Sequence, residues 1–347
     1  MGWQIIRYVE RNTTIAIQWG VVQGDTVTPL HGAYATLAEF LTSGGAEQVR
    51  TLKVNADQAE SVPLASVEPL SPVTAPCRII AQGTNYQAHR RETGTHHGFN
   101  LLFAKADSSL TSARGPVVRP HGVQLLDYEL ELGLVLARAI TGPIEVKSER
   151  LEDVVAGLVM ANDVSARDVQ IPEEQWFRGK SFRTFCPAGP YFYLFDQGDA
   201  ELLAQLRLRL WVNGQLRQDA TADQLIYAPA PTLTLLSQTL DLAPGDLLLT
   251  GTPGGVALRP PTGLARRLGN LLPPARRMRA FVASQRKRAE YLHDGDIVTS
   301  TIATPDGAID LGRQEWEVTT AASPLASPTG EHLRALGERA AISGGDS

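Results

Sequence analysis

Three carboxylates alternate along one short segment of the sequence, Asp127-Tyr128-Glu129-Leu130-Glu131-Leu132. In a β-strand, side chains two residues apart point to the same face, so Asp127, Glu129 and Glu131 would share one face. Like charges held this close repel one another and resist burial. A divalent cation would neutralise them, and oxygen-only ligands suit Mg²⁺, Mn²⁺ or Ca²⁺. The alternative is an exposed edge strand with one polar face.

Asp163 is a further candidate ligand because it follows the apolar run of residues 154–161. A carboxylate at the end of a buried strand can project into a site at the edge of a sheet. The alternative is that Asp163 or Ser165 caps the N-terminus of a helix.

Two segments offer groups that stabilise negative charge on a substrate. Lys180 lies between Gly179 and an aromatic segment, and its ammonium would stabilise an enolate or a carboxylate. The loop 250–255, Thr-Gly-Thr-Pro-Gly-Gly, follows an apolar run and combines hydroxyls with bare amides. It lacks the Gly-Lys-Ser/Thr ending of a P-loop, so nucleotide binding is not supported. Alone, Lys180 is typical of an ordinary surface lysine.

His89 and Glu92 are three residues apart, which makes them neighbours on one helical turn. A glutamate that orients an imidazole raises its basicity, and such a pair can act as a general base for water. The alternative is an ordinary pair of surface residues with no catalytic role.

The elements that must position these residues are mainly short strands separated by turns. The sequence is rich in turn-forming residues, with 31 Gly and 22 Pro among 347 residues. Asn213-Gly214 predicts a β-hairpin, and residues 231–240 suggest a helix. We predict a small β-rich accessory domain over 1–70, a catalytic domain over 77–320, and a flexible tail over 321–347.

Composition and charge exclude several classes of protein. With 43% hydrophobic and 20% charged residues the chain can bury a sizeable core, and disordered or fibrous classes are excluded. The two cysteines, Cys77 and Cys186, cannot form a disulfide scaffold or a cysteine-based zinc cluster. No signal peptide or membrane-spanning run is visible, so we expect a cytoplasmic protein that binds no membrane.

One segment departs from the acidic character of the rest. Residues 259–288 hold nine basic and no acidic side chains, while the whole chain has a formal net charge of −5. We predict a basic insertion over 259–291. It is either a solvated helical excursion or a contact for an anionic substrate or partner. Nucleic-acid binding is not expected, because no aromatic residues are interleaved with the charges.

Taken together, these motifs resemble the fumarylacetoacetate hydrolase superfamily. The matching motifs occur in order over residues 77 to about 317; they are Asn85-Tyr86-x-x-His89-x-x-Glu92, Asp127-Tyr128-Glu129-x-Glu131-Leu132, Asn162-Asp163-Val164-Ser165-Ala166-Arg167-Asp168-Val169-Gln170, Gly179-Lys180-Ser181-Phe182, Cys186-Pro187-x-Gly189-Pro190, Val212-Asn213-Gly214, Gly251-Thr252-Pro253-x-Gly255-Val256 and Asp294-Gly295-Asp296. The resemblance implies an α+β, mainly β fold: a mixed β-sheet roll or sandwich with a few helices, in a homodimer.

The resemblance also implies roles for individual residues. Glu129, Glu131 and Asp163 would bind Mg²⁺ (or Mn²⁺ or Ca²⁺), and His89 with Glu92 would activate water on a lid. The remaining residues would contact a metal-chelated keto acid; they are Lys180, Gln170, Thr252 and Tyr86, with Arg183 facing an anionic or larger tail.

The function implied is hydrolysis of a C–C bond in an acylpyruvate or other 2,4-diketo acid, of the kind used in aromatic catabolism. The substrate would resemble fumarylacetoacetate or fumarylpyruvate. The alternative is a decarboxylase of a β-keto acid such as oxaloacetate, or an enol/keto isomerase, with the same metal site. A non-catalytic binding protein that keeps the fold is a third possibility, which the complete set of site residues disfavours.

Overall fold

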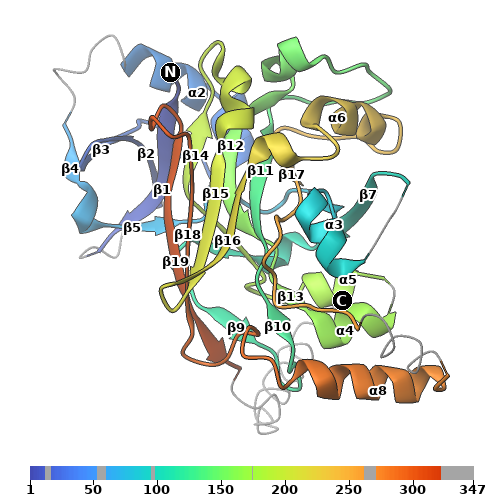
Figure 1. Ribbon diagram of the computed structural model, residues 1–347. Helices are drawn as coiled ribbons and strands as arrows, with labels where there is room; N and C mark the ends of the chain where they lie inside the picture. Colours follow the sequence, from blue (N-terminus) through green and yellow to red (C-terminus); the bar gives the residue numbers. More distant parts are fainter. Residues whose placement is uncertain (12–16, 53–59, 95–97, 174, 262–270, 322–347) are drawn as a thin grey trace, which may run out of the picture.

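The computed structural model describes residues 1–11, 17–52, 60–94, 98–173, 175–261 and 271–321. Strands dominate, and a few short helices lie at the edges of the sheets (Figure 1). This confirms the predicted α+β, mainly β class.

The larger sheet has twelve strands within the described residues. Its main path runs β4 (Val62–Pro63), β3 (Thr26–Pro29), β2 (Gln18–Gln23), β1 (Trp3–Glu10), β14 (Cys186–Leu194), β12 (Val155–Asn162), β11 (Leu130–Leu136), β17 (Leu247–Leu249), β6 (Ile79–Gly83) and β7 (Leu101–Lys105). Off this path, β5 (Val67–Leu70) pairs with β1, and β8 (Leu110–Ser112) pairs with β14.

A second sheet has five strands in the order β16 (Gln215–Thr221), β15 (Arg207–Val212), β18 (Ile297–Ala303), β19 (Asp310–Thr320) and β9 (Val117–Arg119). The short strands β10 (Leu126–Asp127) and β13 (Ser165–Ala166) form a separate pair. The predicted hairpin at Asn213-Gly214 is confirmed: it joins β15 to β16, and both residues have the positive φ that its turn requires.

The main hydrophobic core fills the space between the two sheets. Leu132 and Leu134 of β11 belong to it together with Leu208 of β15 and Trp316 of β19. Val135, with the opposite parity, belongs to a second core on the other face of the large sheet. Strand alternation therefore directs Glu131 to that second face, away from the core between the sheets.

The N-terminal strands continue the large sheet, because β1 pairs antiparallel with β14 over Trp3–Ile6 and Tyr191–Leu194. The helices α1 (Leu37–Thr42) and α2 (Gly45–Leu52) cover this part of the sheet. Phe40 of α1 stacks on Trp19, with ring centroids 5.0 Å apart. The boundaries predicted for the accessory domain stay a prediction.

The remaining helices are α3 (Gln87–Thr93), α4 (Arg167–Glu173), α5 (Phe177–Lys180), α6 (Pro229–Ser237) and α8 (Pro274–Gln285). α6 confirms the helix expected over 231–240. In Figure 1, α3, α4 and α5 lie together beside the strands, and α8 lies below them. The predicted tail from 322 onward lies outside the described residues, as do residues 262–270 of the basic insertion.

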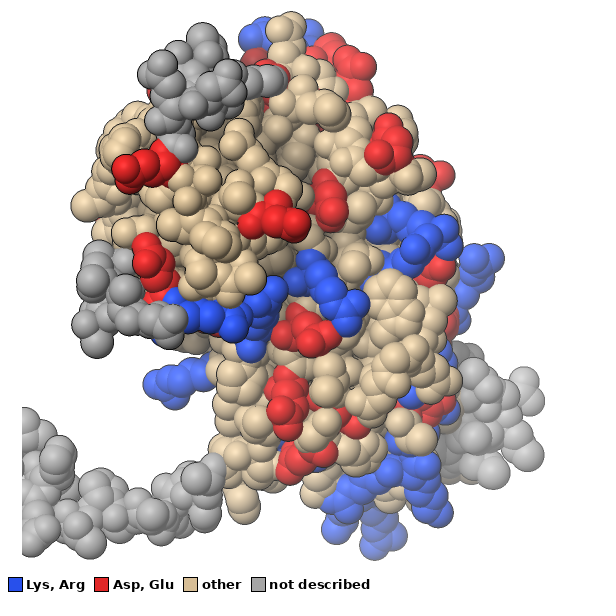
Figure 2. Space-filling model, turned by 90° about the vertical axis from the view of Figure 1, so that its left-hand side faces the viewer, with Lys and Arg blue, Asp and Glu red and all other residues tan. Residues whose placement is uncertain are grey.

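No helix in the described part of the chain is long and apolar enough to cross a membrane. On the face turned to the viewer in Figure 2, basic and acidic side chains are interspersed among uncharged ones.

Candidate active site

The ends of two neighbouring strands bring acidic side chains together. Glu129 precedes β11 and Asp163 follows β12, and the Asp163 amide donates to the Glu129 carbonyl at 2.8 Å. Asn162 Oδ1 accepts a hydrogen bond from the Glu129 amide at 2.9 Å. Glu131 completes the group, in which one carboxylate oxygen from each residue lies within 4.8 Å of the others. Since β11 is buried between β12 and β17, the alternative of an exposed edge strand is wrong.

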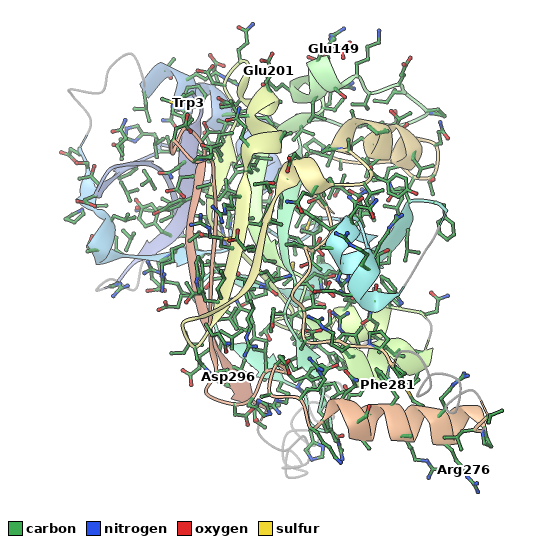
Figure 3. The ribbon with its side chains drawn as sticks, viewed as in Figure 1. Trp3, Glu149, Glu201, Arg276, Phe281 and Asp296 are labelled. Atoms are coloured by element: carbon green, nitrogen blue, oxygen red, sulfur yellow. The ribbon has the colours of Figure 1, made fainter. Side chains whose placement is uncertain are left out.

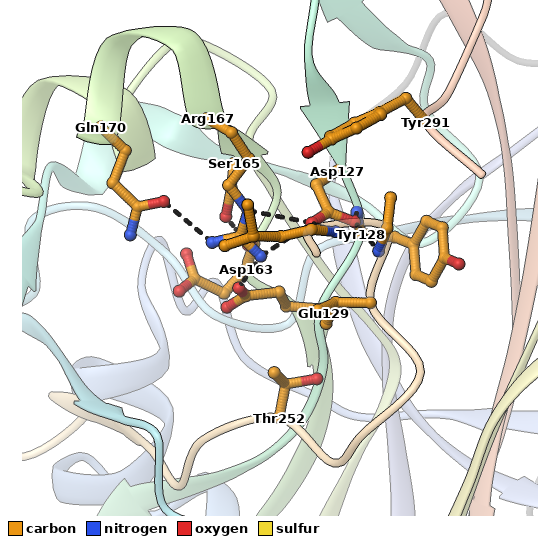
Figure 4. A network of polar contacts seen from close by, with 12 residues as sticks. Asp127, Tyr128, Glu129, Asp163, Ser165, Arg167, Gln170, Thr252 and Tyr291 are labelled. Atoms are coloured by element: carbon orange, nitrogen blue, oxygen red, sulfur yellow. Dashed lines mark hydrogen bonds and ion pairs between the residues drawn. The ribbon is translucent and has the colours of Figure 1, made fainter. Parts of the chain in front are cut away.

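Three buried cations, Lys180, Lys105 and Arg167, surround these carboxylates. Figure 4 shows Arg167 beside Glu129 and Asp127. Lys180 Nζ lies 2.6 Å from Glu129 Oε2 and 2.5 Å from Asp163 Oδ2. Lys105 Nζ lies 2.7 Å from the other oxygen of Asp163. Arg167 forms an ion pair with Glu129. Lys180 is therefore held in the acidic group and is not the surface lysine of the alternative interpretation.

The acidic group is short of positive charge at Glu131. Burial and the nearby Asp163 and Glu129 carboxylates raise the pKa of Glu131 well above its usual value. Burial acts the same way on Glu129, but Arg167 and Lys180 outweigh it and lower the pKa of that carboxyl. A divalent cation would supply the missing charge, and three buried carboxylates are the ligands that Mg²⁺ or Mn²⁺ prefers. The residues present therefore fit a divalent metal ion.

Asp127 does not join this group, contrary to the face assignment made from the sequence. β10 ends at Asp127 and β11 begins only at Leu130, so strand alternation does not extend across the whole segment. The Asp127 carboxylate instead accepts hydrogen bonds from the amides of Ala257 and Leu258 at 2.8 and 3.2 Å. It also accepts one from Arg167 Nε at 2.9 Å. Asp127 thus ties the chain after the Gly-rich loop to the arginine of the acidic group.

The loop 250–255 contacts Glu131 of the acidic group. The Gly251 amide donates to Glu131 Oε2 at 2.7 Å, from a backbone with φ of +90° that favours glycine. Thr252 is buried, and its Oγ1 accepts a hydrogen bond from Gln218 Nε2 at 2.8 Å. The loop therefore fixes the Glu131 side chain, and Gln218 fixes the Thr252 hydroxyl.

Helix α3 places His89 and Glu92 in different surroundings. His89 is 5% exposed, and its Nδ1 has no hydrogen-bond partner among the described residues. Burial lowers the pKa of His89 to about 4. Glu92 accepts a hydrogen bond from the Gly255 amide at 2.9 Å and forms an ion pair with Arg259 at 3.3 Å. Glu92 is therefore committed to the loop and Arg259, and its carboxylate is not bonded to the imidazole.

A cavity of about 870 Å³ opens onto Glu129 of the acidic group and onto His89, while Glu131, Asp163 and Glu92 do not line it. Its lining includes six buried polar or charged side chains, those of His89, Glu129, Arg167, Gln170, Lys180 and Thr252. Gln170 is buried there and accepts a hydrogen bond from Arg167 at 2.8 Å. The basic insertion contributes Arg277 and Arg279 to the cavity lining. Part of that insertion is therefore more than a solvated excursion.

Two of the predicted substrate contacts do not line this cavity. Tyr86 is fully buried, and its hydroxyl has no hydrogen-bond partner in the described part of the molecule. Arg183 is exposed.

Sequence reasoning missed two buried cations. Lys105 ends the apolar strand β7 and reaches Asp163, and Arg167 joins Glu129, Asp127 and Gln170. A lysine that ends an apolar strand is an available signal, because an unpaired buried ammonium is costly. For Arg167 the local sequence offers only its position four residues after Asp163.

The chain belongs to the fumarylacetoacetate (FAA) hydrolase family, since the model of that family's C-terminal domain matches residues 78–319. It is 32% identical over 252 residues to oxaloacetate tautomerase Fahd2a, mitochondrial, from Rattus norvegicus, which covers 71% of this chain and 78% of that protein.

Solved structures share the fold. The fumarylacetoacetate hydrolase of Exiguobacterium antarcticum superposes with a TM-score of 0.68 at 28% identity, covering 92% of this chain and 100% of that one. Maleylpyruvate hydrolase of Sphingobium sp. SYK-6, solved with manganese(II) and pyruvate, gives a TM-score of 0.66 at 24% identity, with the same coverage.

Proposed function

We propose that this protein is a metal-dependent enzyme that interconverts the keto and enol forms of a 2-oxo acid carrying a second carbonyl group at C4. Oxaloacetate belongs to this class of acid. One observation carries the proposal: Glu129, Lys180 and His89 line one cavity. Relatives named oxaloacetate tautomerase, at 32–34% identity over 67–71% of the chain, support the reaction type.

In this proposal Glu129, Glu131 and Asp163 would hold Mg²⁺, with Mn²⁺ or Ca²⁺ as alternatives. The bound ion would supply Lewis acidity to the carboxylate and 2-keto oxygens of the substrate. Gln170 and Thr252, which line the same end of the cavity, are the proposed contacts for those substrate oxygens.

His89 is the proposed base. An imidazole whose pKa is lowered to about 4 is neutral near pH 7 and can accept a proton. It would take a proton from C3 of the keto form. The electron pair of that C–H bond becomes the C2–C3 double bond, and negative charge passes to the 2-keto oxygen.

Lys180 is the proposed stabiliser of that enolate. Burial works against its charge, but Asp163 and Glu129 outweigh burial and raise its pKa, so it stays an ammonium. A charged donor fixed in a buried site stabilises developing negative charge more than water does. Lys180 Nζ would donate a hydrogen bond to the enolate oxygen. The proton that His89 took from C3 would then pass to that oxygen, directly or through water, which gives the enol and restores the neutral imidazole.

A second candidate function is hydrolysis of a C–C bond in an acylpyruvate. A cavity of about 870 Å³ is larger than a four-carbon acid needs, which favours a longer substrate. In that reaction His89 would deprotonate a water for attack on the C4 carbonyl, with Glu92 orienting it. Glu92 would first have to leave Arg259, to which it is bonded in this structure.

One experiment separates tautomerisation from hydrolysis and from decarboxylation. Purified protein with Mg²⁺ is given acetylpyruvate and, separately, freshly dissolved enol-oxaloacetate, while enol absorbance and released pyruvate are followed together. Tautomerisation predicts faster relaxation of the enol signal to its equilibrium value without pyruvate. Stoichiometric pyruvate from acetylpyruvate would establish hydrolysis, and pyruvate from oxaloacetate alone would establish decarboxylation. Rates equal to the protein-free reaction for both acids would refute all three.

A further inference from the structure

The cavity continues well beyond the acidic group. Its fully buried lining, which we call its inner end, is mainly polar or charged and includes Glu129, Lys180 and Thr252. Its volume of about 870 Å³ is in the upper part of the roughly 300–1,000 Å³ range typical of pockets for drug-sized ligands. A four-carbon keto acid held at the inner end would leave most of this space unfilled.

The half-buried lining, which we call the outer part of the cavity, is mainly apolar and comes from elements far apart in the sequence. The walls include Phe103, Ile171, Trp176, Pro260, Met278 and Phe281. Phe103 and Trp176 pack edge to face, with ring centroids 5.1 Å apart. Lys180 lies between the two regions, since its Nζ is 5.3 Å from the centre of the Phe103 ring. The polar inner end of the cavity and its apolar walls therefore adjoin each other at Lys180 and Phe103.

Helix α8 is fastened to the body where it forms this wall. Phe281 packs against the buried cluster of Leu125, Ala257 and Tyr291. Gln285 is buried, donates to the Arg259 carbonyl at 2.8 Å and accepts from the Tyr291 hydroxyl at 3.0 Å. In Figure 3, Phe281 points from α8 toward the body, whereas Arg276 points away from it. The apolar wall is therefore built by specific packing of the basic insertion.

We propose that the outer part of the cavity is a subsite for an apolar acyl or aryl group attached to the C4 carbonyl of the substrate. This inference rests on the proposed function, because binding of the 2-oxo acid at the inner end is what directs the group on C4 (the tail) toward the apolar walls. Each methylene group buried against these walls should improve affinity about fourfold. An aromatic ring would match the faces and edges of Phe103, Trp176 and Phe281.

Arg277 and Arg279 also line the cavity, so an acidic tail is the competing substrate class. The two classes make opposite predictions for ligands of similar length. An apolar tail gains from the walls and is insensitive to salt, whereas a carboxylate tail gains from the arginines and weakens as salt rises.

The test uses N-substituted oxamates, which imitate a 2-oxo acid but cannot enolise or be cleaved at C3. The full chain with Mg²⁺ is titrated calorimetrically with N-methyl-, N-benzyl- and N-(3-carboxypropyl)oxamate. We expect the benzyl compound to bind at least about 30-fold more tightly than the methyl compound. Equal affinities for these two, or tighter binding of the carboxypropyl compound than of the benzyl compound, would overturn the subsite.

Matched variants locate the effect. Met278→Glu and Phe281→Ala should reduce the benzyl-to-methyl affinity ratio at least about fivefold. Ala283→Glu on the same helix and the exposed Phe177→Ala, neither of which lines the cavity, should leave the ratio unchanged. Unchanged affinity for N-methyloxamate shows that a variant is folded. If no oxamate binds even with Mg²⁺, the proposed head site fails as well; if only the tail gain is missing, the proposed function stands.

Discussion

His89 combines burial with a position beside the proposed substrate head. Because burial lowers its pKa to about 4, the imidazole is neutral and competent as a base down to about pH 5. We expect kcat/KM for enol–keto interconversion to be level from pH 8 to about pH 5 and to fall roughly tenfold per pH unit below pH 4. Metal affinity measured at the same pH values shows whether a fall in rate comes from loss of the ion or from protonation of His89. A fall that begins near pH 6.5 would contradict the buried neutral imidazole.

Lys180 is bonded to two of the proposed metal ligands and is also the proposed stabiliser of the enolate. Replacing it by Met removes the ammonium that lies 2.6 Å from Glu129 and 2.5 Å from Asp163. Lys180→Met should therefore slow turnover by about 10²–10³-fold. The same change should tighten Mg²⁺ binding by about tenfold, since one neighbouring positive charge is lost.

Calorimetric titration with Mg²⁺ checks the second effect, with the exposed Lys147→Met as the matched control. Weaker metal binding in Lys180→Met, with Lys147→Met unchanged, would be incompatible with this arrangement.

The strand pattern of the sequence predicts those site residues that lie close together along the chain. Alternation within β11, continued back to the residue before it, identified Glu129 and Glu131, and the end of β12 identified Asp163. Alternation failed for Asp127, because the strand is interrupted between Asp127 and Leu130. The alternation of residue types alone does not show that the strand is interrupted there.

The cations around the acidic group could not be predicted in the same way. Lys105 reaches Asp163 from β7, at the other end of the path β12–β11–β17–β6–β7. The pairing of Glu92 with Arg259 likewise joins α3 to the start of the basic insertion. Contacts of this kind follow from the order of strands in the sheet, which is set by packing of the whole chain.

Asp127 is predicted to hold elements together without taking part in the chemistry. Its carboxylate accepts bonds from Arg167 and from the amides of Ala257 and Leu258, and it is completely buried. Asp127→Asn should lower the free energy of unfolding by about 3 kcal/mol, because Arg167 loses part of its buried compensation. Urea denaturation measures this; the exposed Asp241→Asn should change stability by no more than about 0.5 kcal/mol. Equal free energies of unfolding for the two variants would show that Asp127 does not stabilise the fold in this way.

For the whole molecule, the family resemblance predicts a homodimer. We expect a particle of twice the chain mass of 37.5 kDa, about 75 kDa, by light scattering after gel filtration. This mass should persist on dilution to the nanomolar concentrations of mass photometry. A mass of one chain at all concentrations would contradict the prediction.

If the acidic group binds the divalent ion, enol–keto interconversion depends on that ion and on Glu129 and Glu131. The most direct measurement is the initial rate of enol loss for wild-type protein with Mg²⁺, with EDTA, and for Glu129→Gln/Glu131→Gln with Mg²⁺. The matched control is Glu315→Gln/Glu317→Gln, which alters two exposed glutamates of equal spacing in β19. We predict that EDTA and the first double variant each reduce the rate at least about 10²-fold, while the control retains it. A wild-type rate in EDTA would show that the reaction needs no divalent ion, and a wild-type rate in Glu129→Gln/Glu131→Gln would show that these carboxylates do not hold one.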